Sequence, residues 1–100
     1  MNFSVSDINK ILGDIKKRER LINQFQTFQN ISLDSRTISN CDLFIAIKGS
    51  NFDGHDFLKE VIKKGVKAVV IQEGMQNLLP NKFPFWIVPD TIEAFQKLSL

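Results

Sequence analysis

Cysteine and histidine are almost absent from this 100-residue sequence, which contains one of each, Cys41 and His55. A single cysteine excludes an intramolecular disulfide and a zinc site built from several cysteines. With a single histidine, a Ser-His-Asp triad or a histidine-rich metal site would have to be built around His55 alone. The sequence therefore points to no metal site and to no catalytic residue of its own.

Long apolar runs and a large excess of one charge are also absent. No stretch approaches the roughly 18 apolar residues of a membrane span, and the first ten residues lack the basic start and apolar run of a signal peptide. Thirteen basic residues against 11 acidic ones leave a net charge of +2, which is too small to argue for a nucleic-acid surface. We therefore expect a cytoplasmic protein with no nucleic-acid and no membrane partner.

The composition that is present is typical of a folded, soluble domain. Hydrophobic residues make up 43% of the chain and charged residues 24%, which is the usual mixture in globular proteins. A chain of this length forms one domain and can bury about two-thirds of its unfolded surface.

Helical periodicity occurs in three segments, 5–12, 54–64 and 91–100. Ser6 is the expected N-cap of the first helix and Asp90 that of the third, because short polar side chains accept hydrogen bonds from free helical amides. Glycines directly follow the first two segments, as they commonly do at helix ends. The third helix has barely begun when the sequence stops, and no stop signal is present. Its apolar face, formed by Ile92, Phe95 and residues 98–100, needs a partner, so we expect the chain to be part of a longer protein.

Four segments have the pattern of strands: 21–33, 42–48, 67–71 and 85–88. The first alternates between apolar and polar residues and could be two strands around Gln29-Asn30. The other three are apolar runs typical of strands buried on both faces. Because a helix separates the second from the third, they form a βαβ unit with parallel strands. The sequence thus predicts a single α/β domain in which a mixed β-sheet is flanked by helices. Six side chains are expected in its core: Phe44, Ile45, Ile47, Val69, Val70 and Ile87.

Residues 14–20 are almost entirely charged. They could form a basic patch for phosphates or acidic partners. They could equally be a solvated strand edge or loop, in which Asp14 and Glu19 cancel part of the positive charge.

The segment from Gly49 to His55 lies between a predicted buried strand and a helix, where α/β sheets commonly bind ligands. Its two glycines have the spacing of a phosphate-binding loop, but the required Lys-Ser/Thr is missing, so ATP binding is rejected here. Backbone amides at the helix start could still hold an anion or a nucleobase carbonyl. The alternative is a plain strand–helix turn that uses glycine at positive φ, with His55 as a structural hydrogen-bonding residue.

Leu33-Asp34-Ser35-Arg36 is a second polar segment, at the end of a predicted strand. Its side chains can donate and accept hydrogen bonds in several directions. The alternative is a polar turn with an internal pair between Asp34 and Arg36.

Taken together, several segments resemble the N-terminal domain of the Mur ligases, the ATP-dependent amide ligases of peptidoglycan synthesis. The resemblance covers almost the whole chain, and an ordered set of segments is more specific than any single motif. One departure is Asn40-Cys41, which stands where the family usually has Pro-Gly. The matching segments are Asp34-Ser35-Arg36, Asp42 to Gly49, Phe52 to Phe57, Gly65 to Val70, and Val88 to Thr91.

In the Mur ligases the first domain holds the UDP end of the substrate, so the resemblance implies a uracil site in this chain. Leu33 and Ser35 would line the pocket, and the loop formed by Ser50, Asn51 and Phe52 would close it. Supporting roles fall to the neighbours of these residues: Asp34, Arg36, Gly49, Asp53, Gly54 and His55.

The resemblance also implies a longer parent protein. Its substrate would be a UDP-N-acetylmuramoyl-peptide, and its central and C-terminal domains would bind ATP and Mg²⁺, for which this chain has no loop. Residues 52–57 look most like the family member that joins D-alanyl-D-alanine to UDP-N-acetylmuramoyl-tripeptide. The alternatives are the sister ligase that adds the third residue, diaminopimelate or lysine, and a freestanding, non-enzymatic module that binds a nucleotide or a protein.

Overall fold

The computed structural model describes residues 2–16, 18–40 and 42–99. Its α-helices are α1 (Val5–Leu12), α2 (Leu58–Lys63) and α3 (Thr91–Leu98), and its 3₁₀ helices are η1 (Gly13–Ile15), η2 (Gly54–Phe57) and η3 (Gln76–Leu78). Its strands are β1 (Phe3–Ser4), β2 (Arg18–Arg20), β3 (Thr27–Phe28), β4 (Asn30–Ser32), β5 (Asp42–Ile45), β6 (Val69–Gln72) and β7 (Phe85–Val88).

Five strands form the central sheet in the order β2-β7-β6-β5-β4. The four strands from β4 to β7 are parallel, and β2 pairs antiparallel with β7 at one edge. β1 and β3 form a separate antiparallel pair. The expected mixed sheet and its parallel βαβ unit are therefore confirmed.

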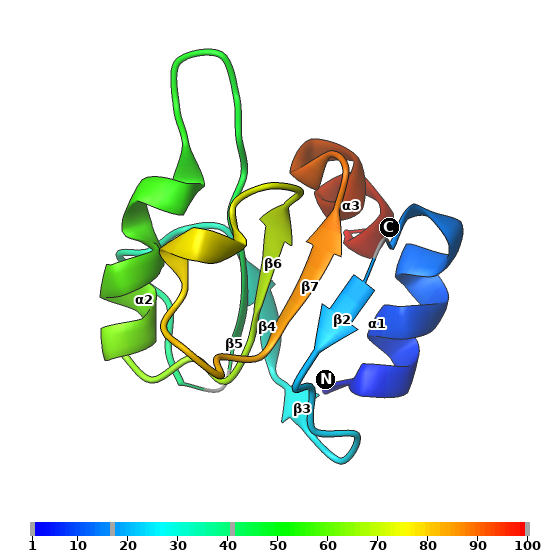
Figure 1. The fold of residues 1–100 in the computed structure, drawn as a ribbon. Coiled ribbons are helices and arrows are strands. Elements are labelled where there is room, and N and C mark those ends of the chain that lie inside the picture. The colour runs from blue at the N-terminus through cyan, green and yellow to red at the C-terminus, as the bar shows by residue number, and fades with distance from the viewer. Residues whose placement is uncertain (1, 17, 41, 100) are drawn as a thin grey trace.

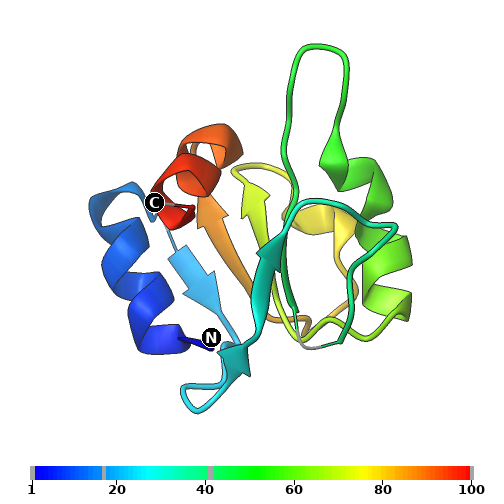
Figure 2. The same cartoon turned by 180° about the vertical axis from the view of Figure 1, so that it is seen from behind.

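Helices cover both faces of the sheet, with α1 and α3 on one side and α2 on the other (Figures 1 and 2). Successive side chains of a strand point to opposite faces, so each covered face has its own apolar cluster. Ile45 and Trp86 pack with α1 and α3, whereas Val69 and Phe85 pack with α2. Of the six expected core residues, five are buried and Ile47 is only partly so.

The start of α1 differs from the prediction. Ser4, not Ser6, caps the helix: its Oγ accepts a hydrogen bond from the Asp7 amide, and Asp7 Oδ2 accepts one from the Ser4 amide, both at 3.0 Å. This reciprocal arrangement is a capping box, in which the residue three positions into the helix reaches back to the cap. Ser6 lies inside the first turn and is exposed.

The strand expected over 21–33 is shorter than its alternation suggested. Residues 21–26 form a turn in which Asn23 Oδ1 accepts a hydrogen bond from the Phe25 amide at 2.9 Å, and Phe25 is 92% exposed. Asparagine competes for backbone amides in this way and so favours turns over strands. Pairing begins only at β3 and β4, on either side of Gln29.

The third helix begins at Thr91, and Asp90 Oδ1 accepts hydrogen bonds from the amides of Ile92 and Glu93, as expected of an N-cap. Its buried residues are Thr91, Ala94 and Leu98, which face α1 and the sheet, whereas Ile92 is 39% exposed. α1 supplies the partner that this apolar face needs. Within the described ranges, no helix is long and apolar enough to cross a membrane.

Candidate functional site

The carboxyl ends of β4 and β5 meet at one edge of the sheet, where parallel α/β sheets place their ligand sites. Residues 33–36 follow β4, and residues 46–53 follow β5 as a loop that projects beyond the sheet at the top of Figure 1. Between the two segments lies a cleft of about 400 Å³. Its lining residues are Leu33, Asp34, Ser35, Arg36, Phe52 and Phe57.

The β4 side of the cleft is a turn closed by its own side chains. Asp34 Oδ1 accepts hydrogen bonds from the Arg36 amide at 2.9 Å and from Arg36 Nε at 3.1 Å, and the Arg36 Nη2 donates to Oδ2. These bonds from the Arg36 side chain and backbone lower the pKa of Asp34 below its ordinary value. The internal pair that the sequence offered as an alternative is thus formed.

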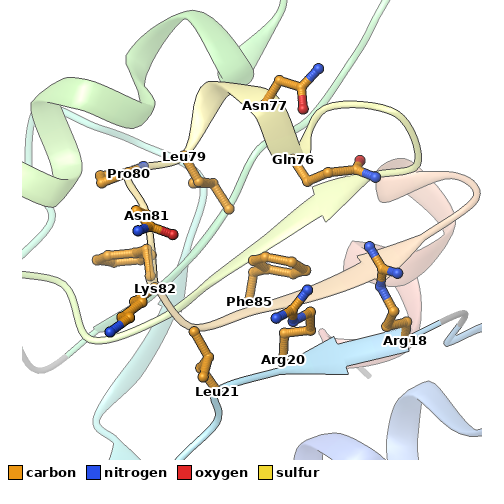
Figure 3. Close-up of a pocket in the computed structure, with 11 residues that line it drawn as sticks. Arg18, Arg20, Leu21, Gln76, Asn77, Leu79, Pro80, Asn81, Lys82 and Phe85 are labelled. Atoms are coloured by element: carbon orange, nitrogen blue, oxygen red, sulfur yellow. The ribbon is translucent and has the colours of Figure 1, made fainter.

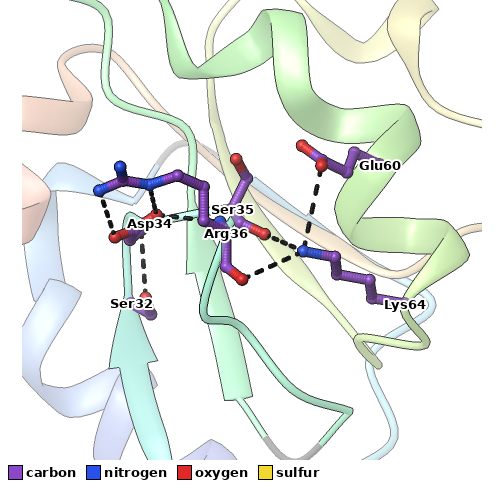
Figure 4. Close-up of polar contacts among 6 residues, drawn as sticks. All are labelled: Ser32, Asp34, Ser35, Arg36, Glu60 and Lys64. Carbon is purple, nitrogen blue, oxygen red and sulfur yellow. Dashed lines mark hydrogen bonds and ion pairs between the residues drawn. The ribbon is translucent and has the colours of Figure 1, made fainter.

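Lys64 ties this turn to the end of α2. Its Nζ donates to the backbone carbonyl of Ser35 and, at 3.4 Å, to that of Arg36, and it also lies 4.0 Å from Glu60 Oε1 (Figure 4). Ser35 is only 7% exposed, and its hydroxyl makes no hydrogen bond with any of the described residues. The cleft is therefore lined by a serine whose backbone is held by Lys64.

The β5 side of the cleft is aromatic. The rings of Phe52 and Phe57 stack with centroids 5.7 Å apart and planes 20° apart. Phe52 is 49% exposed although it is a large apolar residue. A flat apolar wall in a cleft that is also lined by polar residues suits a planar ring with polar edges.

The loop after β5 is closed at its base by three contacts. The Gly49 amide donates to the Phe52 carbonyl at 2.7 Å and the Gly54 amide donates to the Ile47 carbonyl at 2.6 Å, and these two bonds make Lys48 and Asp53 a β-bridge. Lys48 Nζ also pairs with Asp53 Oδ2 at 3.4 Å. Neither glycine has a positive φ. Gly54 is instead required by close approach, because a Cβ there would lie 2.8 Å from the Ile47 nitrogen.

His55 is a buried structural residue. The Gln72 amide donates to its Nε2 at 3.0 Å, so Nε2 is the acceptor and the ring proton lies on Nδ1, which donates to Asp53 Oδ1 at 2.7 Å. Burial alone would raise the pKa of Asp53, but the hydrogen bonds from the His55 amide and ring, together with Lys48, outweigh it and lower that pKa. Both ring nitrogens are occupied, so the structural interpretation of His55 is the one the geometry favours.

These bonds also decide whether the loop could cradle a phosphate chain. The amides of Gly49, Gly54, His55 and Asp56 all donate to acceptors within the loop or to the end of β5. A phosphate-binding loop needs such amides free and needs a lysine as well. The residues therefore do not fit ATP, and the expected anion site at this helix start is not supported.

The structure thus brings together part of the predicted site. Leu33, Asp34, Ser35, Arg36 and Phe52 line one cleft, whereas Ser50 and Asn51 lie at the exposed loop tip outside its lining. Gly49, Asp53, Gly54 and His55 shape the loop. Phe57 was missed as a lining residue, because its apolar periodicity indicated only a core position. The turn at Asn40-Cys41, where the sequence departs from the Pro-Gly of the Mur ligases, includes Cys41, which lies outside the described residues.

Fold and cleft together define a small α/β domain that presents a polar and aromatic site at the carboxyl edge of a mixed sheet. The sequence family described as "Mur ligase family, catalytic domain" matches residues 27–97. The chain belongs to the Mur ligase family.

Individual relatives come from more than one branch of that family. The chain is 36% identical over 96 residues to the UDP-N-acetylmuramoyl-tripeptide--D-alanyl-D-alanine ligase of Synechocystis sp., covering 96% of this chain and 21% of that protein. It is 32% identical over 92 residues to the UDP-N-acetylmuramoyl-L-alanyl-D-glutamate--2,6-diaminopimelate ligase of Phocaeicola vulgatus, covering 92% and 19%. The chain therefore spans about a fifth of the length of these relatives.

The fold is also similar to that of a solved Mur ligase. The crystal structure of MurF from Acinetobacter baumannii superposes with a TM-score of 0.76 over 98% of this chain and 20% of that one, at 22% identity. This similarity confirms the expected α/β fold of a Mur ligase N-terminal domain.

Proposed function

We propose that residues 1–100 are the substrate-docking domain of a longer peptidoglycan-precursor ligase, and that they hold the uracil end of a UDP-N-acetylmuramoyl-peptide. The observation that carries this proposal is the cleft between residues 33–36 and the Phe52–Phe57 stack. A uracil ring needs a flat apolar surface and hydrogen-bonding partners at its edge. The aromatic stack offers the first, and the polar groups of residues 33–36, the Ser35 hydroxyl among them, offer the second.

The contacts available to a nucleoside here are few. Two or three hydrogen bonds contribute about 0.5–1.5 kcal/mol each, against a loss of rigid-body freedom of several kcal/mol. We therefore expect this chain alone to bind UDP with a Kd of roughly 1 mM, or about −4 kcal/mol. Other domains of the parent would contact the muramoyl peptide and tighten binding.

Titration of ¹⁵N-labelled protein with uridine and with UDP, followed by NMR, tests the docking site. Shifts are expected at residues 33–36 and 49–57 with both ligands, and Ser35→Ala should weaken binding. Ser6→Ala, which removes an exposed hydroxyl on α1, is the matched control and should leave binding unchanged. If uridine leaves both segments unshifted, or if UDP shifts only residues 16–20, the uracil site has to be abandoned.

For the parent protein we propose the ligase that joins D-alanyl-D-alanine to UDP-N-acetylmuramoyl-tripeptide, driven by ATP and Mg²⁺ bound in its other domains. The support is the 36% identity over 96 residues to such a ligase. The sister ligase that adds diaminopimelate is the second candidate, because a relative of that kind matches at 32% over 92 residues. Expression of the whole reading frame, followed by assays with each amine and its matching UDP-linked acceptor, separates the two.

The chain by itself is expected neither to bind ATP–Mg²⁺ nor to release phosphate from it. The reason is that the amides of Gly49, Gly54, His55 and Asp56 are already hydrogen-bonded and that His55 stands where a phosphate-binding loop has its lysine. A phosphate-release assay on the purified protein checks this expectation. The expectation would be contradicted by ATP turnover that is abolished by a substitution within residues 49–55 and by no other substitution.

A further inference from the structure

A second cavity, of about 770 Å³, lies at the opposite edge of the sheet from the uracil cleft, against β2. In the antiparallel pairing, Arg18 stands opposite Ile87 and Arg20 opposite Phe85. Directly paired residues project from the same face of a sheet, so both arginines lie on the α2 side. This is the basic segment for which the sequence left a phosphate-binding role open.

The cavity has an apolar floor and a basic wall. Figure 3 shows the ring of Phe85 at its base, Arg18 and Arg20 directed over it from β2, and Leu79 on the far side. The volume is within the range of about 300–1,000 Å³ that is usual for small-molecule sites. Leu21, Pro80 and Phe83 extend the apolar lining.

The charge of this cavity is not neutralised from within. No carboxylate of the described residues lines it, and neither arginine has an ion-pair partner among them. Glu19, between the two arginines, projects to the other face and lies 3.6 Å from Lys16. Two guanidinium groups on one face, held by a strand, match the fork geometry of a carboxylate or a phosphate.

One further feature of the lining points to a ligand. Leu21 and Lys82, at φ 61° and 66°, are the non-glycine residues with positive φ in the described ranges, and both line this cavity. Strained backbone of this kind gathers at binding sites.

We propose that this cavity binds a small organic anion: a carboxylate or phosphate group between Arg18 and Arg20, carried by an apolar or aromatic body that packs on Phe85 and Leu79. The site is separate from the uracil cleft and shares none of its lining residues.

NMR titration of the ¹⁵N-labelled chain tests the proposal with probes that contain no uracil: phenyl phosphate, benzoate and inorganic phosphate. We expect phenyl phosphate or benzoate to shift residues 18–21, 76–85 and the Gln76 side-chain amide, while residues 33–36 and 52 stay unmoved. The aromatic acid should bind about fivefold or more tightly than inorganic phosphate, because its ring covers Phe85. The tighter of the two aromatic probes identifies the acid.

The double variant Arg18→Gln/Arg20→Gln should weaken this binding about tenfold or more, since it removes both charged hydrogen-bond donors. Lys10→Gln/Lys97→Gln removes the same charge from α1 and α3 and should change the Kd less than about twofold. A well-dispersed spectrum of each variant shows that it is folded. Equal weakening by both double variants, equal affinity for inorganic phosphate, or no shift with either aromatic acid would overturn the proposal.

Discussion

Gly54 and His55 fix the geometry of the candidate site although neither lines the cleft. Gly54 lets the start of η2 approach the backbone at the end of β5, and His55 links Asp53 in the loop to the Gln72 amide at the end of β6. The Phe52 ring is held over the cleft by a loop that these two residues anchor. At this scale, the site depends on packing and on buried hydrogen bonds as much as on the residues that face a ligand.

Gly54→Ala should reduce the free energy of unfolding by about 1–3 kcal/mol, as overpacking of a filled interior does. The added methyl would lie 2.8 Å from the Ile47 nitrogen and 3.1 Å from the Ala46 Cα, which are backbone atoms that cannot rotate away. Gly49→Ala is the matched control: its nearest contact is 3.6 Å, so its effect should stay within about 0.5 kcal/mol. Urea unfolding measures both, and equal effects would show that the close approach is not important.

Asp53 should make stability depend on pH. Its pKa is lowered in the folded protein, so its charged form stabilises the fold above the unfolded-state pKa of about 3.9, and this contribution is lost as the pH falls through the folded-state value. The stability difference between wild type and Asp53→Asn should therefore shrink between about pH 5 and pH 2. Urea unfolding followed by the fluorescence of Trp86, the single tryptophan, measures it. A difference that is constant over this range would contradict the assignment.

At the scale of elements, the sequence predicts the buried strands and the three α-helices well, because apolar periodicity and end-capping residues are local signals. The runs that contain β5, β6 and β7 and the cap at Asp90 are examples. The strand predicted over residues 21–26 is wrong, because their alternation is not accompanied by burial and Asn23 forms a turn. The predicted N-cap of α1 is wrong because Ser4 and Ser6 are both acceptable caps. Only the hydrogen bond from the Ser4 amide to the Asp7 carboxylate decides between them.

Ser4→Ala and Ser6→Ala form a matched pair that tests this start. Ser4→Ala removes the acceptor of the Asp7 amide and should reduce the free energy of unfolding by about 1 kcal/mol. Ser6→Ala removes an exposed hydroxyl inside the helix and should change it by less than about 0.5 kcal/mol. Thermal unfolding followed by circular dichroism measures both variants. A larger loss of stability in Ser6→Ala than in Ser4→Ala would show that Ser6 is the cap.

At the scale of the whole molecule, local sequence signals do not give the pairing of distant segments. β2 was recognised only as a charged strand edge or loop, and its antiparallel place beside β7 depends on contacts between residues about 67 positions apart. The candidate cleft was partly predictable, because strand ends are placed by topology and the polar segment 33–36 follows a strand. The Phe52–Phe57 stack was not, since it depends on the path of the loop.

One sheet with an apolar cluster on each face should unfold as a unit. Ile45 and Val69 are both fully buried but lie in different clusters, and replacing either by alanine should reduce the free energy of unfolding by about 2–4 kcal/mol. In both variants, Trp86 fluorescence and far-ultraviolet circular dichroism should give coincident transitions. Ile92→Ala, at a position 39% exposed, is the control. Losses below about 0.5 kcal/mol at both buried positions would show that the sheet is misplaced.

The pairing of β2 with β7 determines when, during synthesis, the N-terminal segment can form its final contacts. The first 20 residues supply α1 and β2, but their partners are β7, α3 and the Trp86 indole, which donates to Asn9 Oδ1 at 2.9 Å. During synthesis these partners leave the ribosome after the rest of the domain, at about 5–20 residues per second. The N-terminal segment must therefore remain without its final contacts for several seconds, and its apolar residues Val5, Ile8 and Leu12 are the surface that a nascent-chain chaperone would meet first.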